Sequence, residues 1–383
     1  MLLALILFFN PAFALTPEQV LKTAWTDKTY LAHEDIQETD SKNPFRSVEA
    51  FYSHERNGNS ETEVGLKFNM KSYPEWRSGS SQTDTHQILK ESSLAWALRD
   101  RYNVLLGYVL GGQKLKLLNN FIEAAEKNLQ AQTLALRAVK TSTKAFLEAK
   151  DEFLRLKRSQ SLLLAERQVL KKRLDRWSLE PESTEIEDLD LIEVDDVAKS
   201  LKEHEKVTQT LSGKLAKEEI WQLDQELKIV KGRENQWFKS FDVSQTAKKD
   251  EHVVEVGLTI FLPPLGSDDW AKQKQNELIL KIALKQRDLE NTSDRLQVLR
   301  FQILNSIELY KLARTNQVVA AKSKSLDPLV NMQTKITSEK EKLELLNQRQ
   351  SILNQYLEYL VESEVLSKEP GINHLSRSKK AIL

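Results

Sequence analysis

The sequence of 383 residues contains no cysteine, only 11 glycines and 9 prolines, and no excess of charge of either sign. Without cysteine the chain forms no disulfide and cannot carry a lipid-modified N-terminal cysteine. The 56 basic and 56 acidic residues are interspersed along the chain, so they offer no positive stripe for nucleic acid. Disulfide scaffolds and nucleic-acid-binding proteins are therefore excluded.

Long apolar runs are also scarce. One lies at the N-terminus, where Leu2 to Phe9 precede Ala12-Phe13-Ala14, the small-x-small pattern of a signal-peptidase site. We predict a signal peptide at residues 1–14, cleaved after Ala14; the alternative is a buried or membrane-anchoring segment. No other run reaches the 18 or so apolar residues that predict a transmembrane helix.

Motifs of catalysis are missing as well. The sequence has no HExxH, phosphate-binding loop, dinucleotide fingerprint or nucleophile elbow. Its 6 histidines are scattered, and none has a second ligand four residues away. We expect no enzyme, no metal site and no cofactor.

What the sequence has in abundance is helical periodicity. A short helix is predicted to start at Thr16, and regions at about 82–178 and about 268–366 are rich in Leu, Lys, Glu, Gln and Ala. Each region has a polar break, at Lys140 to Thr143 and at Thr337-Ser338, where the chain is expected to turn back. Seven-residue spacings typical of a coiled coil connect Ala149, Leu156, Leu163, Leu170 and Trp177. The pattern predicts two long antiparallel helical hairpins.

Two short stretches have the alternating pattern of β-hairpins instead, at about 47–71 and about 237–262. Both contain the tetrapeptide Glu-Val-Gly-Leu, at residues 63–66 and 255–258. Because the order helix, β-hairpin, helical hairpin occurs twice, the chain is interpreted as a duplicated unit. The predicted domains are a first repeat at 15–178, an acidic and solvated linker at 179–196, a second repeat at 197–366 and a disordered basic tail at 367–383.

The strands need a cover for their apolar faces, because four strands with one apolar face are not stable in water alone. In lipid, strands survive in a closed barrel that is apolar outside and polar inside. The apolar stripes of the helices are expected to pack against each other, and four strands are too few to close a barrel, so lipid contact and oligomerisation are predicted. The candidate lipid-facing residues are Val64, Leu66, Phe68, Met70, Val254, Val256, Leu258, Ile260 and Leu262.

Aromatic residues follow the second strand of each predicted hairpin. Tyr73, Trp76 and Trp270 stand where an aromatic belt at a membrane interface is expected. For Trp76 and Trp270 the alternative is that these rings pack into a protein core.

The segments Val256 to Gly266 and Ala97 to Leu106 resemble those of the TolC-like outer-membrane efflux proteins, and the repeated order of elements extends the resemblance over nearly the whole mature chain. The resemblance implies a mainly α fold, with long coiled-coil hairpins and two β-hairpins that contribute to a twelve-stranded barrel in a homotrimer. It implies a passive exit duct in the outer membrane of a Gram-negative cell, for a tripartite efflux pump or a type I secretion system. A periplasmic adaptor (membrane fusion protein) docks on the helical tips, and an inner-membrane transporter supplies the energy.

The resemblance also suggests functional residues near the tips. The candidate adaptor contacts are Val139, Thr141, Ser142, Ile336, Thr337 and Ser338, with simple turn residues as the alternative. The candidate pore acids are Glu148, Asp151, Glu339 and Glu341, with a solvated coiled-coil face as the alternative. The chain departs from the family where Val139 and Lys335 stand in place of the tip glycines, and where Pro328 is expected to kink or break a long helix.

A competing function is a soluble periplasmic coiled-coil scaffold or adaptor without a pore. A channel needs lipid-compatible residues along one face of all four strands, whereas a scaffold does not. A relative that trimerises but has lost its pump partners would share the same sequence pattern.

Overall fold

The structure is a computed structural model that describes residues 16–34, 43–55, 61–78, 83–138, 142–177, 190–204, 210–248, 251–260, 269–320 and 328–383. The predicted signal peptide at residues 1–14 lies outside these residues. The chain divides into two compact units. The first consists of Met1–Ala32, Glu91–Leu211 and Asp294–Leu383, and the second of His33–Lys90 and Ser212–Ser293.

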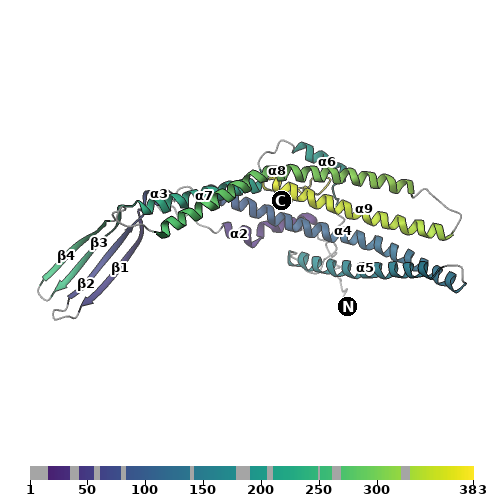
Figure 1. The fold of residues 1–383 in the computed structure, drawn as a ribbon, viewed down its shortest axis with the longest axis horizontal. Coiled ribbons are helices and arrows are strands. Elements are labelled where there is room, and N and C mark those ends of the chain that lie inside the picture. The colour runs from purple at the N-terminus through teal and green to yellow at the C-terminus, as the bar shows by residue number, and fades with distance from the viewer. Residues whose placement is uncertain are drawn as a thin grey trace, which may run out of the picture. The chain divides into compact units, whose positions relative to one another are not determined.

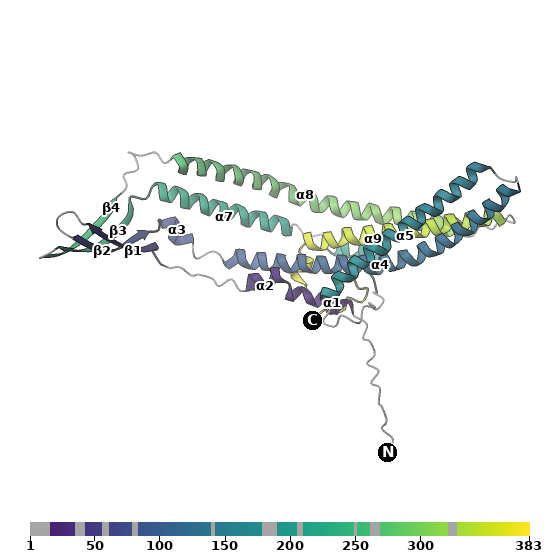
Figure 2. The same ribbon diagram turned by 90° about the horizontal axis from the view of Figure 1, so that it is seen from below.

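Two long helical hairpins dominate the chain (Figures 1 and 2). The first consists of α4 (Thr83–Arg137) and α5 (Thr143–Trp177), and the second of α8 (Asp269–Ala320) and α9 (Pro328–Glu362). The Gln160 amide donates to Asn119 Oδ1 at 2.7 Å between α5 and α4. Arg295 of α8 pairs with Glu358 of α9 at 3.3 Å. The predicted mainly helical fold with long antiparallel hairpins is confirmed.

In the first unit the two hairpins share a core between α4 and α9. Leu118, Phe121 and Ile122 of α4 cluster with Leu156 of α5 and Ile336 of α9. The Lys114 ammonium donates to the Gln350 side chain along the same contact. These four helices therefore contact one another in the order α5, α4, α9, α8, with α5 and α8 at the two ends of the row.

The N-terminal segment packs on the first unit through a buried arginine. Helix α1 (Pro17–Lys22) begins with a capping box between Thr16 and Gln19, and a 3₁₀ turn, η1 (Thr23–Thr26), and α2 (Lys28–Glu34) follow. Arg101 pairs with Asp27 at 2.9 Å, and its guanidinium lies 4.7 Å from the ring centroid of Trp177. One side chain thus joins the N-terminal segment to the end of α5.

The prediction of a disordered tail at 367–383 is wrong. After α10 (Val365–Lys368) the chain folds back, and Leu375 and Ile382 are buried. The Ile192 amide donates to Leu375 O at 2.9 Å. The Tyr102 hydroxyl donates to Ile372 O at 3.3 Å and accepts from the His374 amide at 3.2 Å. The basic composition misled the prediction because the charged side chains of this segment are the exposed ones.

The linker prediction also needs correction at its C-terminal end. Within 179–196, the side chains of Leu191, Ile192 and Val194 are buried, and α6 (Val194–Glu203) begins before the expected start at 197. Among the described acidic residues of this stretch, Asp190 and Asp195 are exposed, and Asp195 pairs with Lys311 of α8 at 2.7 Å. Apolar residues between the acids anchor the end of the linker. Residues 178–189 lie outside the described part of the chain.

The second unit contains a four-stranded antiparallel sheet in the order β1-β2-β3-β4. Its strands are β1 (Phe45–Glu55), β2 (Glu61–Met70), β3 (Phe238–Lys248) and β4 (Glu251–Ile260). Strand β2 pairs with β3, so the hairpins of the two repeats form one continuous sheet. The short helix α3 (Tyr73–Ser78) follows β2, and α7 (Leu211–Glu234) packs on α8 through Leu227, Val230, Ala271 and Leu278.

Candidate functional site on the sheet and at its junction

One face of the sheet is apolar and exposed. The pairing of Leu66 with Ala50 and Val243, and of Val243 with Val256, brings one parity of all four strands to this face. Val256 is 74% exposed and Leu258 is 57% exposed. The face contains the predicted residues Val64, Leu66, Phe68, Met70, Val254, Val256, Leu258 and Ile260, whereas Leu262 lies outside the described residues.

Sequence reasoning missed the contribution of β1 and β3 to this apolar face. Val48 and Tyr52 of β1 and Val243 of β3 are exposed on it. Phe68 is half-buried because its ring stacks on Phe241 at 4.6 Å between centroids. The alternation of Val48, Ala50 and Tyr52 was the available signal, but Glu49 and Asp242 obscured it.

The opposite face is polar. Glu49, Lys67 and Asp242 are register neighbours across β1, β2 and β3. The Asn69 amide donates to Glu49 Oε1 at 2.6 Å and to Ser47 Oγ at 2.8 Å. The sheet therefore separates an apolar surface from a hydrogen-bonded, charged one, as a strand pair between lipid and water requires.

The repeated Glu-Val-Gly-Leu places a glycine on the polar face, opposite a larger side chain. A Cβ on Gly65 would lie 2.5 Å from Phe51 Cζ and 2.7 Å from Ser244 Cβ. A Cβ on Gly257 would lie 2.7 Å from Asp242 Cγ. Both glycines thus make room for a neighbouring strand's side chain, which gives a physical reason for the repeat.

We expect Gly65→Ala to destabilise the sheet by about 1–3 kcal/mol, because Ser244 Cβ is fixed to its backbone and cannot move away. Gly257→Ala should cost less, since the Asp242 carboxylate can rotate. Thermal unfolding of the full chain, followed by circular dichroism, would measure both. Gly371→Ala is the control, because its Cβ would have only Leu383 Cδ1 nearby, at 4.0 Å. Equal melting temperatures for all three variants would contradict this account of the tetrapeptide.

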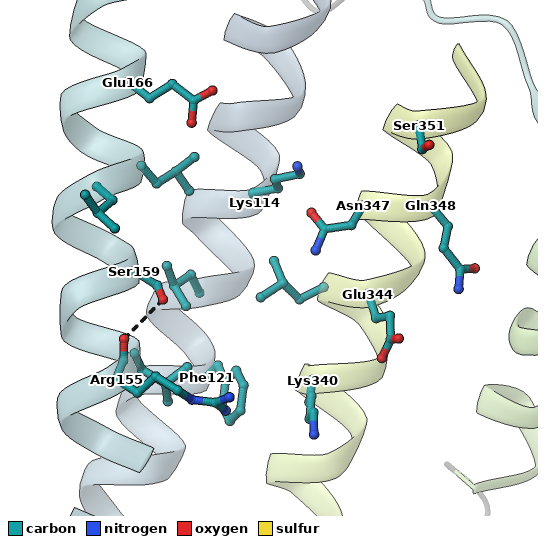
Figure 3. Close-up of a pocket in the computed structure, with 15 residues that line it drawn as sticks. Lys114, Phe121, Arg155, Ser159, Glu166, Lys340, Glu344, Asn347, Gln348 and Ser351 are labelled. Carbon is teal, nitrogen blue, oxygen red and sulfur yellow. Dashed lines mark hydrogen bonds between the residues drawn. The ribbon is translucent and has the colours of Figure 1, made fainter. Parts of the chain in front are cut away.

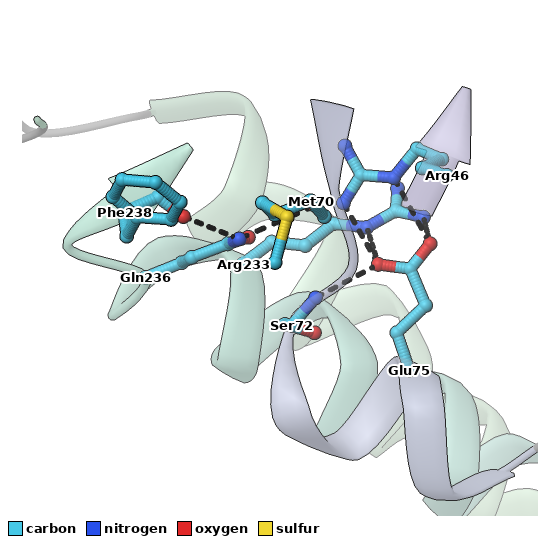
Figure 4. A network of polar contacts seen from close by, with 7 residues as sticks. All are labelled: Arg46, Met70, Ser72, Glu75, Arg233, Gln236 and Phe238. Atoms are coloured by element: carbon cyan, nitrogen blue, oxygen red, sulfur yellow. Dashed lines mark hydrogen bonds and ion pairs between the residues drawn. The ribbon is translucent and has the colours of Figure 1, made fainter. Parts of the chain in front are cut away.

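The sheet is tied to the helices of the second unit by a carboxylate between two guanidinium groups (Figure 4). Glu75 of α3 pairs with Arg46 of β1 at 2.7 Å and with Arg233 of α7 at 2.8 Å. The Gln236 amide donates to Phe238 O at 2.6 Å and to Met70 O at 3.3 Å. These contacts join the starts of β1 and β3 to α3 and α7.

The Glu75 carboxylate remains ionised in acid. Burial by itself would raise the pKa of Glu75, but the hydrogen bonds and charges of Arg46 and Arg233 outweigh burial and lower this pKa to about 2. Since the ordinary pKa is 4.5, the stabilisation is complete above about pH 4.5 and is lost as the pH falls toward 2.

Glu75→Gln is expected to lower the stability of the full chain at pH 7 by about 1–2 kcal/mol, because two arginines then face each other without a carboxylate. The variant should also lose part of the stability change between pH 5 and 3. Denaturant unfolding at several pH values would test both. The control is Glu277→Gln, which removes exposed ion pairs with Lys281 and Lys274 and should leave stability nearly unchanged. A Glu75 variant no weaker than this control would contradict the prediction.

The predicted belt aromatics are all exposed. Tyr73 and Trp76 lie on α3 with ring centroids 6.5 Å apart, and Trp270 lies in the first turn of α8. Trp237, directly before β3, is exposed as well and was missed because the sequence analysis placed it inside a strand. The core-packing alternative for Trp76 and Trp270 does not apply in the single chain, because both rings are exposed.

A groove runs between α5 and α9 over α4 in the first unit (Figure 3). Its volume is 810 Å³, and its apolar lining includes Leu118, Phe121 and Leu343. Lys114, Glu166, Lys340, Glu344 and Asn347 add polar groups to the lining. The lining thus combines apolar side chains with charged side chains of both signs.

No protein-family model matches the sequence, and no curated protein matches it. Solved structures do match. A membrane protein from Pseudomonas aeruginosa has a TM-score of 0.53 and 11% identity, covering 90% of this chain and 89% of that chain. The open state of the MtrE outer membrane channel of Neisseria gonorrhoeae has a TM-score of 0.52 and 11% identity, covering 92% and 88%. The CmeC outer membrane channel of Campylobacter jejuni has a TM-score of 0.51 and 10% identity, covering 91% and 83%.

The chain has the TolC-like fold. At this level of identity the likeness establishes the fold alone, so functional conclusions depend on the residues themselves. Within the described part of the TolC-like fold, no helix is long and apolar enough to cross a bilayer. No group of three or more His, Asp or Glu side chains among the described residues is placed to hold a metal ion.

The second tip of the TolC-like fold is not where the sequence analysis placed it. Ile336, Thr337 and Ser338 lie inside α9, and the break falls between Ala320 and Pro328. Of the two outcomes expected at Pro328, a kink or a break, the structure has a break: Pro328 begins α9, where its missing N–H costs nothing. Lys335, expected at the turn, is also helical. At the first tip Ser142 is exposed directly before α5, whereas Val139 and Thr141 lie outside the described residues.

The four candidate pore acids of the TolC-like fold have different surroundings. Glu148 and Asp151 are exposed near the start of α5. Glu339 is buried and accepts a hydrogen bond from Lys342 at 2.7 Å, and Glu341 is half-buried on the same helix. Because α9 begins at Pro328, this second pair lies about three turns from the tip. A role in a pore ring remains a prediction for all four.

Proposed function

We propose that this protein is an outer-membrane exit duct, in which three copies close a twelve-stranded barrel and a helical tunnel continues into the periplasm. The observation that carries the proposal is the exposed apolar face of the sheet, backed by a polar face. No helix among the described elements covers Val64, Val256 or Leu258, and hydrocarbon is the solvent in which such a face is stable.

Unsatisfied strand edges support association of several copies. β1 and β4 are the edge strands of the sheet, and a strand edge in lipid needs a hydrogen-bonding partner. A four-stranded sheet cannot close on itself. Pairing of β4 with β1 of the next copy satisfies both edges, and three copies give the strand number of the proposed barrel.

The outer helices support the same association. α5 and α8 each present an exposed apolar stripe whose members recur near helical spacing. The stripe on α5 contains Leu147, Leu154, Leu162 and Val169, and the stripe on α8 contains Val298, Phe301, Leu309 and Leu312. Contact of α5 with α8 of the next copy would bury both stripes.

The proposed duct is passive, and its partners are a periplasmic adaptor and an inner-membrane transporter. We place the adaptor at the helical tips and along the groove between α5 and α9, since apolar grooves with charged rims are the kind that amphipathic helices bind. Transport of small molecules or of polypeptides is compatible with this architecture.

Planar-bilayer conductance of the full chain, purified from membranes in detergent, tests the proposal. We expect stepwise channels, together with a trimer whose gel mobility changes on heating. A monomer that is soluble without detergent and forms no channels would favour the scaffold alternative.

A further inference from the structure

Helix α3 has two unlike faces. Pro74 and Glu75 point toward the rest of the second unit: a Cβ on Gly232 of α7 would lie 2.9 Å from Pro74, and Glu75 holds two arginines. Tyr73, Trp76 and Arg77 share the other side of this short helix, because positions three and four residues apart lie on one face. All three are exposed, and Arg77 donates to the Tyr73 hydroxyl at 3.4 Å.

The start of β3 adds a third aromatic residue and a second cation beside α3. Gln236 donates to Met70 O, which brings this part of the chain next to the segment leading from β2 into α3. Trp237 and Lys239, on either side of Phe238, are both exposed. We call Tyr73, Trp76, Arg77, Trp237 and Lys239 the anchor surface.

Charge and position favour one kind of partner for the anchor surface. Glu75, the acid nearest to it on α3, is neutralised by Arg46 and Arg233, so the surface carries a net positive charge. It adjoins the helix-proximal end of the exposed apolar face, where β2 ends and β3 begins. Aromatic rings beside cations are the residues that occupy the headgroup layer of a membrane.

We propose that the anchor surface binds the phosphate headgroups of anionic phospholipids in the leaflet next to the helices. This inference depends on the proposed membrane function and adds a lipid preference to it. The rings of Tyr73, Trp76 and Trp237 lie at the boundary of the acyl chains, while Arg77 and Lys239 contact phosphate.

Tryptophan quenching by brominated lipids can measure the preference. The full chain is reconstituted into phosphatidylcholine vesicles that contain phosphatidylglycerol, with either lipid brominated. The quenching of Trp76 fluorescence is obtained as the difference between the quenching of the unchanged protein and that of Trp76→Phe. Since one cation near an anionic surface is worth about a fivefold change in binding, brominated phosphatidylglycerol should be enriched several-fold at Trp76.

The double variant Arg77→Gln/Lys239→Gln should lose this enrichment, and Lys150→Gln, which removes an exposed cation of α5, should keep it. Trp96→Phe controls for an exposed tryptophan in the first unit. Equal quenching of Trp76 by both lipids, or a double variant that keeps the preference, would overturn the inference and leave the membrane function intact. A preference abolished by inorganic phosphate at constant ionic strength would also overturn it. If neither brominated lipid quenches Trp76, that result would instead contradict the proposed function. Trp76 would remain unquenched if a second copy of the chain covered α3.

Discussion

Leu258→Arg is expected to abolish assembly of the protein in the outer membrane, whereas Thr259→Arg is expected to be tolerated. The two residues are neighbours on β4 but lie on opposite faces of the sheet. An arginine on a lipid-facing strand costs about 2–4 kcal/mol near the bilayer centre, and a trimer incurs this cost in each copy. An arginine on the polar face meets water.

Membrane fractionation and heat-dependent gel mobility of the two variants would measure the difference. The pair is well matched because both side chains are exposed in the single chain. A soluble scaffold would therefore tolerate both substitutions equally. Equal assembly of Leu258→Arg and Thr259→Arg would exclude a lipid-facing role for this face.

Leu375→Ala is expected to destabilise the first unit by about 2–5 kcal/mol, the usual cost of emptying a buried leucine site. Leu375 is only 1% exposed, and its carbonyl accepts the Ile192 amide at 2.9 Å. Loss of the Leu375 side chain is also expected to weaken the neighbouring hydrogen bond that the His374 amide donates to the Tyr102 hydroxyl. The C-terminal segment thus contributes to the stability of the fold and is not an unpacked extension.

Denaturant unfolding of Leu375→Ala beside Arg377→Ala would test this role. The Arg377 side chain is exposed, and its amide would still donate to Asp190 O in the variant. The control should therefore lose less than about 0.5 kcal/mol. If the two variants unfold alike, the segment does not contribute to the stability of the unit.

The sequence predicted the elements whose signal is local and periodic. The alternation around Val64 and Val256 located both hairpins, and the seven-residue spacing from Ala149 to Trp177 located α5. It failed where a boundary depends on context: Thr337-Ser338 is polar but lies mid-helix, while Pro328 is compatible with a helix start as well as a kink.

The candidate site was only partly predictable for a different reason. Arg46, Glu75 and Arg233 come from distant parts of the chain, and only the fold brings them together. Nothing in the local sequence of Trp237 distinguishes a strand residue from an exposed ring before the strand. The tail at 367–383 has a basic composition, but its few apolar residues decide its structure.

The pairing of β2 with β3 has a consequence for the symmetry of the assembly. It shows that a strand of the first repeat accepts a strand of the second repeat as its neighbour within one chain. In the proposed trimer, β4 and β1 of adjacent copies meet with the same kinds of partner. The β2–β3 pairs within each copy and the β4–β1 pairs between copies therefore alternate around a barrel of approximately sixfold symmetry. A substitution confined to one repeat then perturbs every second β-hairpin of this barrel.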